Sequence, residues 1–152
     1  MDLFLWRHAN ALSGGPDLER ELSPAGHRQA AEAAEWLRAN SPAYLRIFSS
    51  PALRARQTAA HFCENENSIE LCRPLYENAS PDEILAILGW PDIVLPALII
   101  SHEPTMGIFS SRLLAGKNRP SSFRTGALWW LRHQPMYNDW NLLNVIEPRL
   151  NF

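Results

Sequence analysis

Two histidines and up to three arginines follow short apolar segments of this sequence, where they could form one basic pocket. Arg7 and His8 come directly after the first apolar run, Arg54 and Arg56 follow the second, and His102 follows a later one. An arginine side chain offers a planar fork of N–H donors that matches the oxygens of a phosphoryl group or a carboxylate. The amides of helices beginning nearby would add partial positive charge. The sequence therefore predicts a site for a doubly charged phosphoryl group.

These residues meet only if the apolar runs are neighbouring strands of one sheet. The runs alternate with amphipathic segments, which is typical of a mostly parallel sheet covered by helices. Strands are expected over residues 3–6, 45–48, 68–72, 98–100, 126–131 and 141–146. Helices are expected to begin at Ser23-Pro24, Ser50-Pro51 and Ser80-Pro81, with a fourth after residue 102. We therefore expect an α/β three-layer sandwich with a mostly parallel central sheet, helices on both faces and ligands at the carboxyl ends of the strands.

Length and composition exclude several classes of protein. The chain has 152 residues, 46% of them hydrophobic, and we expect a single domain over residues 1–152. Fourteen basic and sixteen acidic residues give a net charge of −2, which argues against a nucleic-acid partner. The longest apolar run, residues 95–100, is too short to cross a membrane, and the N-terminus does not resemble a signal peptide. We expect a cytoplasmic protein with no membrane partner.

No cofactor or metal ion is expected. The sequence has no glycine-rich phosphate-binding loop and no run of aspartates that would hold magnesium, so a nucleotide kinase or GTPase is disfavoured. Its five histidines form no close ligand pair, and Cys63 and Cys72 are nine positions apart, which matches no metal-binding spacing. A pocket for phosphoryl groups would have to work with side chains alone.

Four ordered blocks carry a resemblance to a known family. They are Leu5-Trp6-Arg7-His8-Ala9, Leu22-Ser23-Pro24-Ala25-Gly26-His27-Arg28-Gln29-Ala30, Ser49-Ser50-Pro51-Ala52-Leu53-Arg54-Ala55-Arg56-Gln57-Thr58-Ala59 and Ile100-Ser101-His102-Glu103-Pro104. The first resembles the Arg-His-Gly signature of the histidine phosphatase superfamily, and the others resemble its first-helix motif, its second block and the block with its second histidine. The compact length and the Ser-His-x-Pro form are similar to the SixA-like phosphohistidine phosphatases.

The resemblance implies a role for each residue of the basic pocket. His8 is the implied nucleophile, which attacks phosphorus and is transiently phosphorylated before water releases phosphate. Its attacking nitrogen must be unprotonated, so the other ring nitrogen should donate to a backbone carbonyl. Arg7, Arg54 and His102 are the implied ligands of the phosphoryl oxygens, acting through position and charge. Asn10 and Ser13 are further candidates for polar contact with phosphate.

Two features leave the resemblance open to alternatives: the identity of the general acid and the residue after His8. Larger members of the family use a carboxylic acid to protonate the leaving group, and Glu77 lies in the segment that resembles the acid-bearing loop. Glu103, next to His102, is a second and weaker candidate, because it could instead favour a helix N-terminus. Ala9 stands where the family usually has glycine, so a slightly altered pocket is expected.

The leading hypothesis is a cofactor-independent phosphatase that acts on phosphohistidine in a protein. A protonated imidazole is a better leaving group than an alkoxide, so this substrate needs less help from an acid. The segment between His8 and residue 22 is short, so an open pocket that admits a folded partner is expected. Alternatives are a phosphatase for small phosphorylated metabolites and a phosphate-binding module without catalysis, which Ala9 would favour.

Overall fold

The apolar runs of the sequence form the centre of a six-stranded sheet. The computed structural model describes residues 1–114 and 122–149. The strands are β1 (Asp2–Arg7), β2 (Arg46–Ser49), β3 (Ile69–Leu71), β4 (Ala97–Ser101), β5 (Leu128–Gln134) and β6 (Asp139–Ile146). Their order across the sheet is β3-β2-β4-β1-β5-β6. Strands β3, β2, β4 and β1 are parallel, and β5 and β6 extend the sheet in antiparallel fashion.

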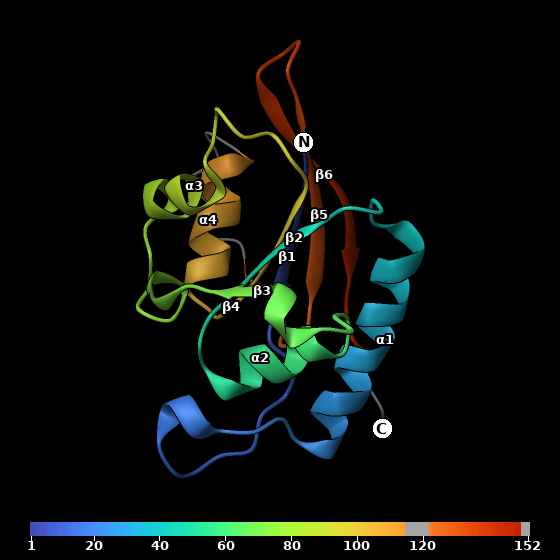
Figure 1. Ribbon diagram of the computed structural model, residues 1–152, viewed down its shortest axis with the longest axis vertical. Coiled ribbons are helices and arrows are strands. Elements are labelled where there is room, and N and C mark those ends of the chain that lie inside the picture. Colours follow the sequence, from blue (N-terminus) through green and yellow to red (C-terminus); the bar gives the residue numbers. More distant parts are fainter. Residues whose placement is uncertain (115–121, 150–152) are drawn as a thin grey trace.

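Helices cover both faces of this sheet, which confirms the expected three-layer α/β architecture. They are α1 (Pro24–Asn40), α2 (Leu53–Ala60), α3 (Pro81–Leu88) and α4 (Thr105–Leu113). Helices α1 and α2 pack on one face, and α3 and α4 pack on the other (Figure 1). The side chains of β1 alternate between the two cores, since Leu3 and Leu5 join one cluster and Phe4 and Trp6 the other. A continuous apolar run is therefore buried on both sides, as the sequence indicated.

The expected start of the second helix was wrong. Helix α2 begins at Leu53 and not at Ser50-Pro51, and Ala52 is its N-cap. The Ser50 hydroxyl oxygen does accept the amide of Ala52, at 3.2 Å, but this bond closes a turn that precedes the helix. By contrast, Ser23 and Ser80 cap α1 and α3 as expected, each with a proline in the first turn.

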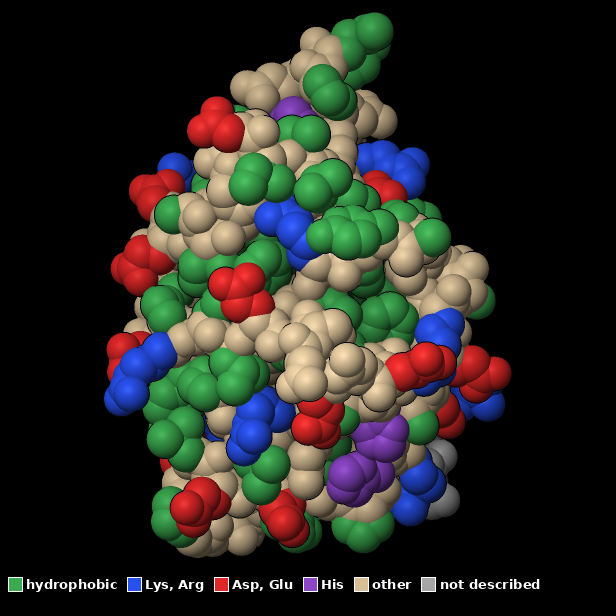
Figure 2. Space-filling model, viewed as in Figure 1, with side chains coloured by type: hydrophobic (Ala, Val, Ile, Leu, Met, Phe, Trp, Pro, Cys, Tyr) green, Lys and Arg blue, Asp and Glu red, His purple; other side chains and the backbone are tan. Residues whose placement is uncertain are grey.

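The surface shows no accumulation of one sign of charge on the face drawn in Figure 2, where basic and acidic side chains are interspersed. This distribution agrees with the net charge of −2. Among the described residues, no helix has the length and apolar character that crossing a bilayer requires.

The N-terminus of α1 is fastened to the segment that follows β1. The amide of Ser23 donates to the carbonyl of Asn10 at 2.9 Å, and the Ser23 hydroxyl donates to the Asn10 side-chain oxygen at 2.6 Å. Gly26 permits this approach, because a Cβ atom at that position would lie 1.9 Å from the Asn10 carbonyl oxygen. A glycine inside a helix usually weakens it. Here it allows α1 to lie directly against the chain that leads away from β1.

Gly26→Ala should therefore destabilise the protein. The added methyl group collides with backbone, which cannot rotate away, so the free energy of unfolding should fall by about 1–3 kcal/mol. Chemical denaturation monitored by tryptophan fluorescence measures this change. Glu35→Ala, at an exposed position of the same helix, serves as the control. A Gly26→Ala protein as stable as this control would contradict the argument.

Candidate active site

Sheet register brings the two histidines of the predicted site together. Arg7 is paired with Ser101 across the parallel strands β1 and β4, so His8 and His102 leave the sheet side by side. Their ring centroids are 5.0 Å apart, and the two residues are only 9% and 8% exposed. Both lie at the carboxyl ends of central strands, where open α/β sheets bind ligands.

A backbone hydrogen bond selects the tautomer of His8. Its Nδ1 atom lies 2.8 Å from the carbonyl oxygen of Ala9, which can only accept, so Nδ1 carries the proton and Nε2 is left with a lone pair. Burial lowers the pKa of His8 to about 4, and the charges of Arg54 and Arg7 act in the same direction. His8 is therefore neutral at pH 7, with one ring nitrogen available as a nucleophile.

His102 is held by Ser50 through Nε2, whereas His8 is held through Nδ1. The Ser50 hydroxyl accepts the amide of Ala52, so its own proton is free to donate to Nε2 of His102, 2.7 Å away. In the tautomer that accepts from Ser50, Nδ1 of His102 carries the ring proton, and this atom is buried without a partner among the described residues. Burial lowers the pKa of His102 to about 3, and the neighbouring His8 and Arg54 contribute. The result is a neutral imidazole with a free N–H donor.

The two arginines are anchored through part of their guanidinium groups. Nη1 of Arg7 donates to the carbonyl of Phe123 at 2.7 Å. Arg54, only 6% exposed, donates from Nη1 to the carbonyl of Asp17 at 2.7 Å and from Nη2 to its carboxylate at 3.1 Å. Among the described residues, the Nε–H of each arginine has no acceptor. Buried Nε–H donors of cationic groups beside a neutral imidazole form an environment suited to an oxyanion.

Ala9, which stands in place of the glycine usual in the family, has its methyl group in the hydrophobic core. The residue is fully buried within the cluster under α1 and α2. Its amide donates to the Thr58 hydroxyl at 3.1 Å, and the carbonyl of His8 before it accepts the amide of Gly126 at 2.9 Å. The backbone around His8 is thus tied to α2 and to the segment that precedes β5.

The polar candidates Asn10 and Ser13 take other positions. The side-chain oxygen of Asn10 accepts a hydrogen bond from the Ser23 hydroxyl, and the backbone amide of Asn10 donates to Oε1 of Gln29 at 3.1 Å. Asn10 therefore links the chain after β1 to α1, as described above. Ser13 lies exposed in the loop between β1 and α1. Neither residue is brought into contact with the histidines by the interactions that the structure shows.

The two candidate acids differ in their surroundings. Glu77 forms an ion pair with Arg73 at 2.7 Å, with both side chains more than half exposed. Glu103 accepts the amide of Gly107 at 2.8 Å at the start of α4, and burial raises the pKa of its carboxyl group. It is Tyr76, the neighbour of Glu77, that lies against His102, with an edge-on ring contact at 5.9 Å.

Sequence reasoning missed Asp17, which joins the site from the short helix Asp17–Glu19. In addition to its two bonds with Arg54, its carboxylate accepts the Tyr76 hydroxyl at 3.0 Å and a bond from Arg20 at 3.3 Å. An isolated acid in a polar loop gives no sequence signal, because most such residues are simply solvated. Only the folded arrangement shows that it faces a buried arginine.

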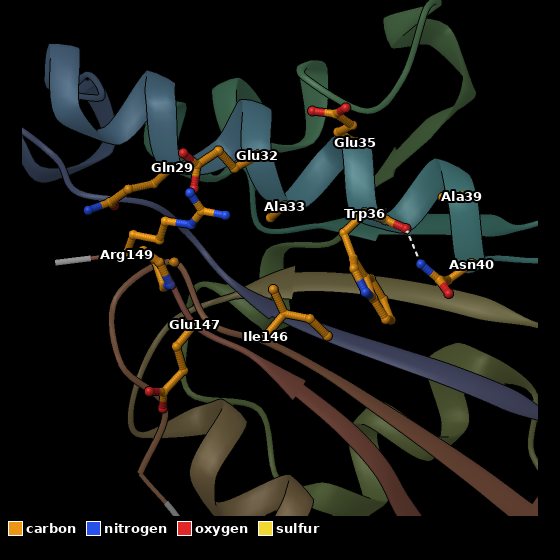
Figure 3. A pocket seen from close by; sticks show the side chains of 12 residues that line it. Gln29, Glu32, Ala33, Glu35, Trp36, Ala39, Asn40, Ile146, Glu147 and Arg149 are labelled. Atoms are coloured by element: carbon orange, nitrogen blue, oxygen red, sulfur yellow. Dashed lines mark hydrogen bonds between the residues drawn. The ribbon is translucent and has the colours of Figure 1, made fainter. Parts of the chain in front are cut away.

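A separate cavity of about 560 Å³ lies between α1 and the segment after β6. Figure 3 shows Glu32 pointing toward Arg149 across it, with Gln29, Glu35 and Glu147 also on its walls. Three carboxylates among its lining residues make it a poor site for a phosphoryl group. In the parts of the chain that the structure describes, no three His, Cys, Asp or Glu side chains are grouped so as to hold a metal ion.

Comparison with protein-family models matches residues 3–79 to the histidine phosphatase superfamily, branch 1. The chain belongs to the histidine phosphatase superfamily. An uncharacterised protein of Mycobacterium leprae is 37% identical over 110 residues, which cover 71% of this chain and 67% of that protein. A second, from Mycobacterium tuberculosis, is 40% identical over 101 residues, covering 65% of this chain and 63% of that protein. This chain thus spans about two thirds of the length of these curated relatives.

Matches to SixA cover more of this histidine phosphatase than the matches to the mycobacterial proteins do. Phosphohistidine phosphatase SixA of Escherichia coli is 28% identical over 134 residues, which cover 84% of this chain and 83% of SixA. The structure of the protein histidine phosphatase SixA complexed with tungstate superposes with a TM-score of 0.83 at 25% identity, covering 97% of each chain. The family and these likenesses support a hydrolase of the phosphatase class.

The lowered pKa of His8 gives this histidine phosphatase a testable acid limb. A histidine whose pKa is about 4 stays neutral above that value, so His8 should remain unprotonated across the range in which an ordinary histidine becomes protonated. The kcat/KM for p-nitrophenyl phosphate, corrected for ionisation of the substrate, should fall only near about pH 4. A decline centred near the ordinary histidine pKa of about 6.5 would contradict this environment for His8.

Proposed function

We propose that this protein removes the phosphoryl group from phosphohistidine in a partner protein, through a covalent intermediate on His8. The observation that carries the proposal is the tautomer of His8. Its Nδ1–H is committed to the Ala9 carbonyl, so a neutral ring presents Nε2 beside His102, the half-buried Arg7 and the buried Arg54. A site that served only to bind phosphate would not need an unprotonated, oriented nucleophile at its centre.

The reaction follows from this arrangement in two displacements. In the first, Nε2 of His8 forms a bond to phosphorus while the P–N bond of the substrate breaks, and its electron pair returns to the substrate ring. In the second, water attacks the phosphorylated His8 and releases inorganic phosphate, which restores the neutral imidazole. The covalent intermediate thus divides one difficult transfer into two easier steps.

Arg7, Arg54 and His102 are proposed to hold the phosphoryl oxygens throughout. In the part of the chain that the structure describes, the Nε–H groups of both arginines and Nδ1 of His102 have no hydrogen-bond partner. Negative charge spreads over the phosphoryl oxygens in the transition state, and fixed donors stabilise it without further reorganisation. Bound phosphate would also offset the burial that keeps His102 neutral, since an anion nearby favours the protonated ring.

The choice of phosphohistidine rests on the leaving group and on the likeness to SixA. A substrate imidazole that carries a proton on its second nitrogen departs as a neutral ring, so no acid is required. The candidate acid Glu77 is engaged with Arg73 on the surface, which agrees with chemistry of this kind.

The two cysteines, Cys63 and Cys72, are both free, and free thiols suit a reducing compartment such as the cytoplasm.

Hydrolysis of small phosphate esters is the alternative activity. A mycobacterial glucosyl-3-phosphoglycerate phosphatase has a similar fold, with a TM-score of 0.66 at 17% identity over 93% of this chain. An ester substrate leaves as an alkoxide and requires a proton donor. Glu103 is the described acid whose pKa burial raises, so it is the group that an ester hydrolase of this architecture would use.

Intact-mass spectrometry during turnover of a phosphohistidine peptide tests the proposal. The wild-type protein should acquire the mass of one phosphoryl group, in an acid-labile adduct that decays as phosphate is released. His8→Ala should form no adduct and lose at least about a thousandfold in activity, because the nucleophile is absent. His61→Ala, which removes a histidine outside the site, should behave as wild type.

Two results would contradict the mechanism. Phosphate release that is unaffected by His8→Ala would show that another group attacks phosphorus. An adduct that survives acid would place the phosphoryl group on an oxygen nucleophile. Phosphate binding to the wild-type protein without any adduct or hydrolysis would favour the non-catalytic alternative.

A further inference from the structure

Asp17 is a half-exposed carboxylate at the mouth of the site, which we define as the surface formed by Asp17, Arg20 and Tyr76. Its side chain is 50% exposed, whereas that of its partner Arg54 is only 8% exposed. The carboxylate accepts from Arg54, Arg20 and the Tyr76 hydroxyl at 3.1, 3.3 and 3.0 Å. It is therefore fixed in place from three sides and still open to a ligand.

Anchoring of Arg54 alone does not account for this carboxylate. The backbone carbonyl of Asp17 already accepts from Nη1 of Arg54 at 2.7 Å, and this bond does not depend on the side chain. Burial raises the pKa of Asp17, but the hydrogen bonds from Tyr76 and Arg54 and the charge of Arg54 together outweigh it and hold the pKa below its ordinary value. The Asp17 carboxyl group is ionised at neutral pH, so it can accept a hydrogen bond from an N–H group but cannot act as a general acid.

Asp17 lies close to the histidines of the site, because Tyr76 donates to its carboxylate and contacts the ring of His102. His8 lies at the floor of the site, 9% exposed, directly after β1. An attacking nitrogen and a leaving group lie roughly in line on opposite sides of phosphorus. The leaving group must then point outward from His8, toward the mouth. Asp17 lies at the mouth, where its carboxylate contacts Arg54.

We propose that Asp17 determines the specificity for an imidazole leaving group, by accepting a hydrogen bond from the ring N–H of the substrate histidine. This inference rests on the proposed function and names the residue that recognises its substrate. The phosphoryl group occupies one ring nitrogen, and the other carries a proton when the ring is cationic. Asp17 holds that proton on the ring while the P–N bond breaks, and the ring leaves neutral with the P–N electron pair. The same carboxylate repels a leaving group that departs as an anion.

Two substrates that differ in leaving group test this proposal with Asp17→Asn. The variant keeps the size of the side chain and the backbone bond to Arg54, but it removes the negative charge. The kcat/KM for a phosphohistidine peptide should fall by about ten- to a hundredfold, as expected for loss of a charged hydrogen bond. The kcat/KM for p-nitrophenyl phosphate, which releases a phenolate anion, should stay level or rise. Glu19→Gln, an equal change of charge in the same short helix, should leave the ratio of the two values unchanged.

The outcomes separate this inference from the proposed function. A wild-type protein that hydrolyses phosphohistidine, with both substrates affected equally or not at all by Asp17→Asn, overturns the role of Asp17 alone. A wild-type protein that hydrolyses p-nitrophenyl phosphate but not the phosphohistidine peptide overturns the proposed substrate and this inference with it. A change in the ratio that Glu19→Gln reproduces would assign the effect to general charge at the mouth and also overturn the specific role of Asp17.

Discussion

The backbone of residues 8–10 is the constraint on which the rest of the site depends. The hydrogen bond from Nδ1 of His8 to the Ala9 carbonyl frees Nε2, and its geometry is only as fixed as the peptide that supplies the carbonyl. The amide of that same peptide, on Asn10, donates to Gln29, and the preceding His8–Ala9 peptide is held by the Gly126 amide and the Thr58 hydroxyl. Because these partners come from α1, from the segment before β5 and from α2, the orientation of one imidazole depends on packing across the domain core.

This constraint explains family motifs that carry no chemistry themselves. Ser23, Gly26 and Gln29 lie in a block that resembles a family motif, and in the structure they hold Asn10 against the start of α1. Gln57 does the same for the Leu22 amide, which its side-chain oxygen accepts at 2.7 Å. The loop before α1 lacks the regular hydrogen bonds of a helix or strand. Ser23, Gln29 and Gln57 supply hydrogen bonds in their place, and Gly26 leaves the room that the close approach requires.

The sequence was sufficient to predict the layers of the fold and the edge of the sheet at which His8 and His102 meet. Apolar runs of strand length, separated by capped amphipathic helices, allow few arrangements other than a parallel sheet, and residues that follow its strands then share one edge. His8 and His102 were found in this way. Contacts made by loops could not be predicted, because nothing local distinguishes Asp17 from a solvated acid or shows that Ser50 faces His102. The same limit applies to Glu77, whose spacing alone could not reveal its ion pair with Arg73.

Charge at the site is arranged in layers, and this order bears on the chemistry. At the floor, burial keeps His8 and His102 neutral, and the arginines reinforce this by opposing a further positive charge. At the mouth, Asp17 is ionised and partly offsets the same arginines. Neutral imidazoles beside cationic donors favour the entry of a phosphoryl dianion, whereas the ionised Asp17 carboxylate at the mouth, although paired with Arg20, can accept a hydrogen bond from a cationic group. Phosphohistidine with a protonated ring, the proposed substrate, carries its charges in this order along the line of transfer.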